Sequence, residues 1–168
     1  REGNPDIFLY DLTRNSWRQI TEHFGIDTEP DWSPNGKSLL FTSNRSGSPQ
    51  IYQVNIRTKR VKRLTFEGTY NARARYSPDG KSIVFVHRRD GVFHIATQKI
   101  KSGKVRILTD TSLDESPTIS PNGNVIIYAT KKLDEDILAG ITIDGKTKFI
   151  LPSLQGETRE PAWSPILD

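Results

Sequence analysis

The chain has 168 residues, of which 34% are hydrophobic and 26% are charged, a balance typical of a globular domain rather than of a disordered or fibrous chain. No apolar run approaches the roughly 18 residues of a membrane-spanning helix, so we expect no direct membrane insertion. The absence of cysteine excludes disulfides and thiolate chemistry, and a net charge of +4 tolerates an anionic partner without requiring one.

The predicted elements are short strands throughout, because no window keeps the 3.6-residue period of an amphipathic helix. Residues 1–25 supply two strands, the outer ones of a four-stranded unit. The next unit, 26–68, has predicted strands at 29–33, 38–43, 50–56 and 61–65, which are rich in β-branched and aromatic residues and separated by Gly, Pro, Asn and Ser. Four-stranded units follow at 69–111 and 112–156, and 157–168 supplies the inner strand of a closing unit.

A repeated turn sets the period of these units. It recurs at spacings of 44, 43 and 44 residues, as Ser33-Pro34-Asn35-Gly36, Ser77-Pro78-Asp79-Gly80, Ser120-Pro121-Asn122-Gly123 and Ser164-Pro165. Large apolar residues hold the same phase, among them Phe41, Phe85 and Tyr128, each eight residues after its serine. Four-stranded units of about 40–45 residues are the blades of a β-propeller. The predicted fold class is therefore all-β, a fragment of a propeller.

The number of units indicates an open arc. Three whole units and two partial ones are present, and the sequence lacks Met, so we expect it to be a segment of a longer natural protein. The cut ends of an arc would expose apolar blade faces, because each blade buries its faces against its neighbours. We therefore expect the fragment to self-associate.

The loops between units are the candidate binding surface, because they lead into the innermost strands and ring the central channel. The predicted mouth positions are Asp27, Thr28 and Glu29, then Asn71, Ala72 and Arg73, then Asp114, Glu115 and Ser116, and finally Thr158, Arg159 and Glu160. Their mixed charges favour a specific protein surface over a uniform polyanion. For any one of them, hydrating the channel entrance or capping a strand end is an equally good interpretation.

Other chemistry is weakly indicated. The basic run at 57–63 could bind an anionic surface or nucleic acid, but its alternation, with Val61 and Leu64 inward, favours a solvated outer hairpin, so we expect no nucleic-acid partner. No histidine or carboxylate group has a recognised metal spacing, and no nucleophile elbow, phosphate loop or dinucleotide motif is present. We therefore expect no cofactor, no metal and no catalysis.

The repeat resembles the β-propeller domain of the TolB family. The residues that carry the resemblance are TEPDW (28–32), FTS (41–43), LDESP (113–117), NGNVIIY (122–128), TIDGK (142–146) and PAWSP (161–165). The resemblance implies a six-bladed ring, a preceding α/β domain that contacts other Tol proteins, and a location in the periplasm. It also implies a non-enzymatic part in the Tol–Pal envelope system, with links to outer-membrane integrity, protein transport and cell division.

The partner that the resemblance implies is the peptidoglycan-associated lipoprotein (Pal), docked over the propeller mouth. Thr28 and Glu29 coincide with the family's partner-binding loop and rank first among the candidates. Residues 71–75 are more basic than the family pattern, which weakens the transfer of contacts there. An alternative is the gating propeller of a serine hydrolase or peptidase, which would require a nucleophile elbow outside this chain.

Overall fold

The computed structural model describes residues 4–133, 135–152 and 158–164, and the strands within them form four antiparallel sheets. The first sheet pairs β1 (Phe8–Asp11) with β2 (Ser16–Gln19). The three sheets that follow have four strands each: β3 (Asp27–Trp32), β4 (Ser38–Ser43), β5 (Gln50–Asn55) and β6 (Val61–Arg63); β7 (Tyr70–Tyr76), β8 (Ser82–Arg89), β9 (Val92–Lys99) and β10 (Val105–Ile107); β11 (Glu115–Ile119), β12 (Val125–Lys132), β13 (Glu135–Thr142) and β14 (Lys148–Ile150).

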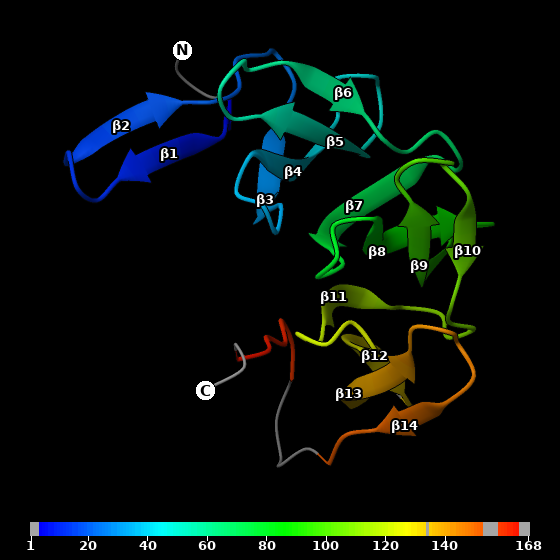
Figure 1. Ribbon diagram of the computed structural model, residues 1–168. Coiled ribbons are helices and arrows are strands. Elements are labelled where there is room, and N and C mark those ends of the chain that lie inside the picture. Colours follow the sequence, from blue (N-terminus) through cyan, green and yellow to red (C-terminus); the bar gives the residue numbers. More distant parts are fainter. Residues whose placement is uncertain (1–3, 134, 153–157, 165–168) are drawn as a thin grey trace.

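The sheets fan around one side of a common axis (Figure 1). In each complete sheet the strands follow chain order, with β3, β7 and β11 innermost and β6, β10 and β14 outermost. This arrangement confirms the prediction of a partial β-propeller. The described residues contain no helix long and apolar enough to cross a membrane.

The repeated Ser-Pro turns form as predicted, between the first and second strands of each complete blade. The amide of Gly36 donates to the carbonyl of Ser33 at 2.8 Å, and Gly80 and Gly123 repeat this bond at the same distance. Gly36 has a φ of +66°, a left-handed conformation that glycine adopts without a steric cost. The serine hydroxyl closes the turn by accepting from the first amide of the next strand, at 2.9 Å from Ser38 N to Ser33 Oγ.

Each innermost strand contains a bulge near its start. The register shifts between Thr28 and Asp31 in β3, and at the same phase in β7 and β11. The first strand was predicted to begin at residue 29, but β3 begins at Asp27, because pairing with β4 continues on both sides of the bulge. A bulge re-aims the side chain of the extra residue. Here it aims side chains at the mouth.

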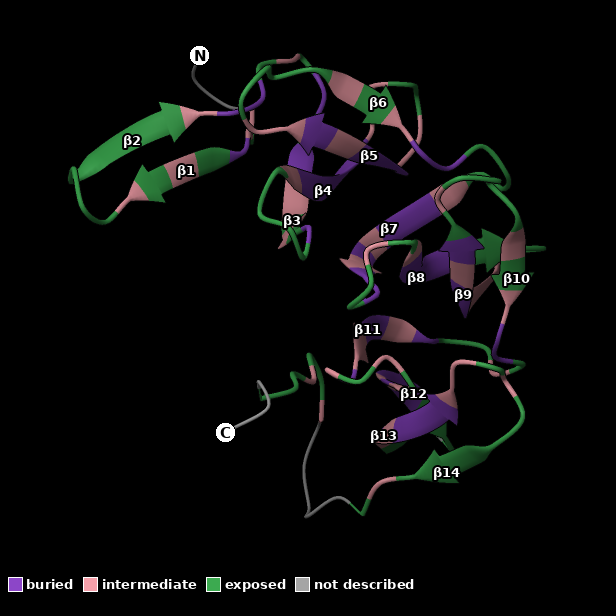
Figure 2. Cartoon of the chain, in the orientation of Figure 1, coloured by how far each residue is buried: buried purple, intermediate pink, exposed green. Residues whose placement is uncertain are grey.

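The core lies between successive sheets. Phe41, Phe85 and Tyr128, predicted from their shared phase, are buried, and the middle strands of each blade are the most buried part of the molecule (Figure 2). One cluster joins Leu40 and Ile51 of one blade to Ala74 and Phe85 of the next, and a second repeats this between the following pair. Burying such side chains stabilises each interface by roughly 1.5–3 kcal/mol per residue.

The ends of the arc differ from its middle. All three residues of β14 are exposed, since no further described sheet covers that strand. Residues 158–164 carry no strand assignment, although an inner strand was expected at 157–168. Residues 157 and 165–168 of that prediction lie outside the described residues. In Figure 1 the described segment lies on the inner side of the last sheet.

Candidate functional site

The twelve predicted mouth positions fall into three groups by their order within each loop, and only the first group has a uniform exposure in the complete blades. The first position of each complete blade is buried, with exposed fractions of 1% for Asp27 and 0% for both Asn71 and Asp114. The second position ranges from buried Ala72 through half-buried Thr28 and Glu115 to exposed Arg159. The third position ranges from buried Ser116 through half-buried Glu29 and Arg73 to exposed Glu160. Each group has its own hydrogen bonds.

Asp114 holds its loop by accepting hydrogen bonds from three threonines. Thr111 donates to Asp114 Oδ1 at 2.5 Å, Thr130 of β12 donates to the same atom at 2.7 Å, and Thr109 donates to Oδ2. Thr109 also accepts from the amide of Ile95 at 2.9 Å, so the carboxylate connects strands β9 and β12 to the loop before β11. A buried carboxylate needs such partners, because an unpaired one would be costly to remove from water.

Asn71 plays the same part in the preceding blade without a charge. Its amide nitrogen donates to Gln50 Oε1 and to the carbonyl of Glu67, both at 2.8 Å. Its oxygen lies 2.8 Å from Nδ1 of His87, which therefore carries the proton on that nitrogen. Burial lowers the pKa of His87, so the neutral imidazole is the form that fits this network.

Asp27 is held by an ion pair. Arg45 donates to Asp27 Oδ2 at 2.6 Å, and the same guanidinium lies about 5 Å from the ring centres of Phe41 and Tyr52. This places a charge-assisted bond and a cation–π contact behind the loop that carries Thr28. In all three complete blades, the first position therefore supports the loop from inside.

The third positions form a charged cluster across the axis. Glu29, Arg73, Ser116 and Glu160 all have φ between 51° and 57°, an uncommon conformation for residues other than glycine. Arg73 Nε lies 3.3 Å from Glu29 Oε1, and Arg73 Nη1 donates to Ser116 Oγ at 2.7 Å and to the carboxylate of Glu160. Ser116 donates to Glu160 Oε1 at 2.9 Å. Inner segments of four repeats thus meet at Arg73.

The protonation of this cluster follows from those bonds. Burial alone would raise the pKa of Glu160, but the hydrogen bonds from Arg73 and Ser116 outweigh it and lower the pKa. Burial would likewise lower the pKa of Arg73, and the carboxylates of Glu160 and Glu29 reverse that effect. The cluster therefore contains an ionised Arg73 guanidinium and an ionised Glu160 carboxylate at neutral pH.

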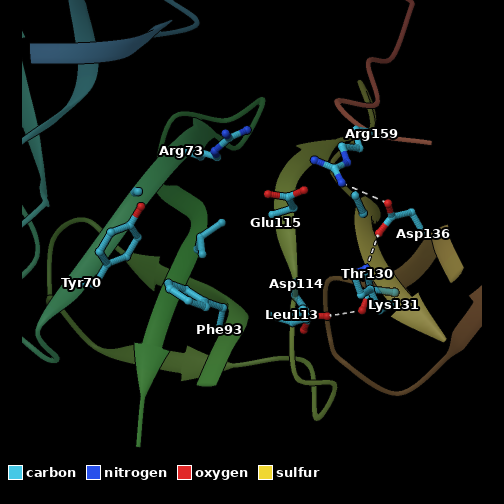
Figure 3. Close-up of a pocket in the computed structure, with 13 residues that line it drawn as sticks. Tyr70, Arg73, Phe93, Leu113, Asp114, Glu115, Thr130, Lys131, Asp136 and Arg159 are labelled. Carbon is cyan, nitrogen blue, oxygen red and sulfur yellow. Dashed lines mark hydrogen bonds and ion pairs between the residues drawn. The ribbon is translucent and has the colours of Figure 1, made fainter. Parts of the chain in front are cut away.

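A pocket of about 280 Å³ opens beside the cluster, between the blade of β7–β10 and that of β11–β14 (Figure 3). Its apolar wall includes Tyr70 and Phe93, whose rings meet edge to face at 5.3 Å. Leu113 stands at its edge with 49% of its surface exposed. An exposed leucine between two aromatic rings and a charged rim is suited to contact with another molecule.

The rim of the pocket opposite Tyr70 has one carboxylate between two cations. Asp136 Oδ2 accepts from Arg159 at 3.1 Å, and Asp136 Oδ1 lies 3.4 Å from Lys131 Nζ, as Figure 3 shows. The hydrogen bond from Arg159 is the largest cause of the lowered pKa of Asp136. Arg73 and Glu115 complete the charged part of the wall. The rim can therefore bind polar groups of either sign.

The structure brings together residues that the sequence analysis did not select. The pocket is also lined by Tyr70 and Leu113, at the ends of loops between blades, and by Phe93, Lys131 and Asp136, beside the β8–β9 and β12–β13 turns. The sequence indicates only Leu113 among them, because it directly precedes the predicted mouth residue Asp114. Among the described residues, no group of three or more histidines and carboxylates could hold a metal ion.

Comparison with known proteins gives consistent matches. The family model for the TolB beta propeller domain matches residues 1–167. The crystal structure of TolB from Acinetobacter baumannii is 49% identical, with a TM-score of 0.91, over 98% of this chain and 42% of that one. A putative TolB from Agrobacterium tumefaciens is 27% identical, with a TM-score of 0.78, over 89% of this chain and 57% of that one.

Curated sequences agree over a shorter segment. The Tol-Pal system protein TolB of Pseudomonas entomophila is 51% identical over 63 residues, which are 38% of this chain and 14% of that protein. The chain thus spans less than half the length of the Acinetobacter structure, and the aligned segment spans about a seventh of the Pseudomonas relative.

Proposed function

The chain belongs to the TolB β-propeller family, and from that premise we propose that its mouth is a docking site, without catalysis, for a protein of the Tol–Pal system. The proposed partner is Pal, and the proposed location is the periplasm. Contacts with other Tol proteins are assigned to parts of the full-length protein outside this chain. The match to TolB over residues 1–167 supports this function over the gating propeller of a hydrolase.

The observation that carries the proposal is the pairing of an open apolar pocket with a charged cluster at one end of the ring. Leu113 and Phe93 offer apolar contact, while Arg73, Glu29 and Glu160 offer charged hydrogen-bonding groups within the same mouth. Protein interfaces combine such an apolar centre with a polar rim. A uniform polyanion would meet carboxylates here, so a protein with its own mixed charges is the better fit.

The predicted site residues divide into two roles under this proposal. Those that a partner would contact directly are the accessible ones: Thr28, Glu29, Arg73, Glu115, Arg159 and Glu160. Those that would support the loops from inside are the buried ones: Asp27, Asn71, Ala72 and Asp114. Substitutions in the first group should change affinity, and substitutions in the second should change stability first.

Calorimetric titration of the full-length protein with the soluble domain of Pal tests the proposal. Glu29→Lys reverses a charge in the cluster and places it beside Arg73, so affinity should fall about tenfold or more, as for other central interface residues. Leu113→Asp should have a similar effect through the pocket. Lys62→Glu, on the exposed edge strand β6, is the control and should leave affinity unchanged.

Two results would contradict the proposal. One is an absence of measurable binding between the unmodified protein and Pal. The other is that the Glu29→Lys and Leu113→Asp variants bind Pal with the same affinity as the Lys62→Glu control. A mouth that tolerates both changes is not the contact surface. Circular dichroism of each variant separates loss of binding from loss of folding.

A further inference from the structure

The end of the propeller arc opposite the mouth has a strong net positive charge. We call this end the turn face and define it as residues 12–15, 33–37, 56–60, 77–81, 100–104, 120–124 and 143–147. Backbone bonds tie these turns together in each complete blade, as from Ile56 N to the carbonyl of Lys37 and from Ile100 N to that of Lys81, both at 3.0 Å. The mouth lies at the other end of the same strands, because β3 runs from Asp27 to the turn at Ser33.

The turn face concentrates the basic residues of the chain. It contains nine lysines and arginines, namely Arg14, Lys37, Arg57, Lys59, Arg60, Lys81, Lys101, Lys104 and Lys146. Its acids are two aspartates, Asp79 and Asp144. The whole chain has 24 basic and 20 acidic residues, so the remainder of the chain has 15 basic and 18 acidic residues. The basic excess of the chain therefore comes entirely from this end.

These cations are exposed and mostly lack an acidic partner. All nine lie on exposed positions. Arg14 pairs with Asp11 at 2.8 Å, and Lys146 lies 3.8 Å from Asp144. Within the described residues, the other seven have no ion pair. Like charges gathered at one end repel one another, and an anionic surface would relieve that repulsion.

The arrangement of the turns favours a broad contact over a pocket. Turns of successive blades lie side by side, since a methyl group added to Gly80 would sit 3.7 Å from Pro34 Cδ, and one added to Gly123 would sit 3.4 Å from Pro78 Cδ. The turn-face loops contain no aromatic residue on which a nucleic-acid base could stack. Their cations stand on the exposed tips of separate blades, which suits many weak contacts to an extended charged plane.

We propose that the turn face binds the anionic headgroups of a phospholipid bilayer. The contact is peripheral: lysine and arginine side chains approach lipid phosphates, and no segment enters the hydrocarbon. Each basic residue near an anionic membrane strengthens binding by about fivefold. The inference is independent of Pal docking, because the two surfaces lie at opposite ends of the blades, and one does not obstruct the other.

Cosedimentation of the full-length protein with vesicles tests this proposal. The protein should bind vesicles of equimolar phosphatidylcholine and phosphatidylglycerol, should not bind pure phosphatidylcholine, and should be released in about 1 M salt, where charges are screened within about 3 Å. The triple variant Arg57→Gln, Lys101→Gln, Lys104→Gln should bind about a hundredfold more weakly. A control triple variant, Arg88→Gln, Arg89→Gln, Lys132→Gln, removes the same charge from exposed positions near the mouth and should bind normally.

Several outcomes would overturn the proposal. Failure to bind the anionic vesicles is one, and it is the result expected if another part of the full-length protein covers the turn face. Equal loss of binding in the two triple variants is another, since it would reflect net charge and not this surface. Retention of double-stranded DNA without retention of the vesicles would also refute it, because the partner would then be a polyanion of another class.

Discussion

Asp114→Ala tests whether the first mouth position supports the fold from inside. The carboxylate is fully buried and accepts hydrogen bonds from Thr109, Thr111 and Thr130. A hydrogen bond to a charged group contributes about 1.5–3 kcal/mol, but removing the carboxylate also removes the cost of burying it. We therefore expect a net loss of about 1–3 kcal/mol, the cost of leaving buried hydroxyls without their acceptor. Urea denaturation of the full-length protein, followed by tryptophan fluorescence, measures this as a lower midpoint at unchanged slope.

A matched variant separates support from contact. Asp114→Asn keeps the shape and one acceptor oxygen, so it should cost about half as much free energy of unfolding as Asp114→Ala. Neither variant should change the affinity of the folded protein for Pal by more than about twofold. The reasoning is refuted if Asp114→Ala lowers the free energy of unfolding by less than about 1 kcal/mol. It is equally refuted if Asp114→Asn weakens Pal binding severalfold while stability is unchanged.

Three further predictions concern the imidazole network, the repeated turn and the ends of the arc. Burial lowers the pKa of His87 in the folded state below its unfolded value of 6.5. The stability that the neutral, buried ring contributes is therefore fully present above pH 6.5 and is lost as the pH falls through the folded pKa. Nitrogen-edited NMR should show a neutral ring with the proton on Nδ1 at pH 7. Gly80→Ala should cost about 1 kcal/mol in thermal unfolding, because φ there is +67°. The 168-residue chain should sediment as a dimer or larger species, since Phe8 and Trp17 are exposed at one end of the arc; a monomer at high concentration would contradict this.

The sequence predicts the fold well because the blade is a local structure repeated in phase. The turn at Ser33 and the strand 38–43 depend on residues close in the chain, and both recur in the next blades. Phe41 is buried against Ile7 and Ile20 of the preceding sheet, but its phase in the repeat already marks it as a core residue. The start of β3 was misplaced by two residues because a bulge has no clear composition signal. The residue that takes the left-handed conformation is Glu in one blade, Arg in the next and Ser in the third.

The candidate site could be predicted only in part, because burial at the mouth depends on distant partners. Nothing in the loop alone distinguishes Asp114, which is fully buried, from Glu115, which is half-buried. Asp114 accepts from Thr109 and Thr111 just before it and from Thr130 of β12. The repeat gives a signal for the first of these, because Thr65 and Thr109 recur at a spacing of 44 residues and both donate within these buried networks. The pocket could not have been predicted this way, since Tyr70 of β7 and Phe93 of β9 meet across β8, where both pair with Arg88, and the repeated turn does not indicate that register.

The repeat separates support from recognition within three successive residues. The first mouth position keeps a buried polar group in each complete blade, so the loop geometry is maintained from blade to blade. The third position keeps the left-handed backbone but changes its side chain, and Glu29, Arg73 and Glu160 can therefore meet as opposite charges across the axis. If the third mouth position held the same side chain in every blade, the cluster would contain either like charges that repel one another or no charges at all. A symmetric backbone thus builds an asymmetric surface by varying one position, and such a surface can select one orientation of a partner.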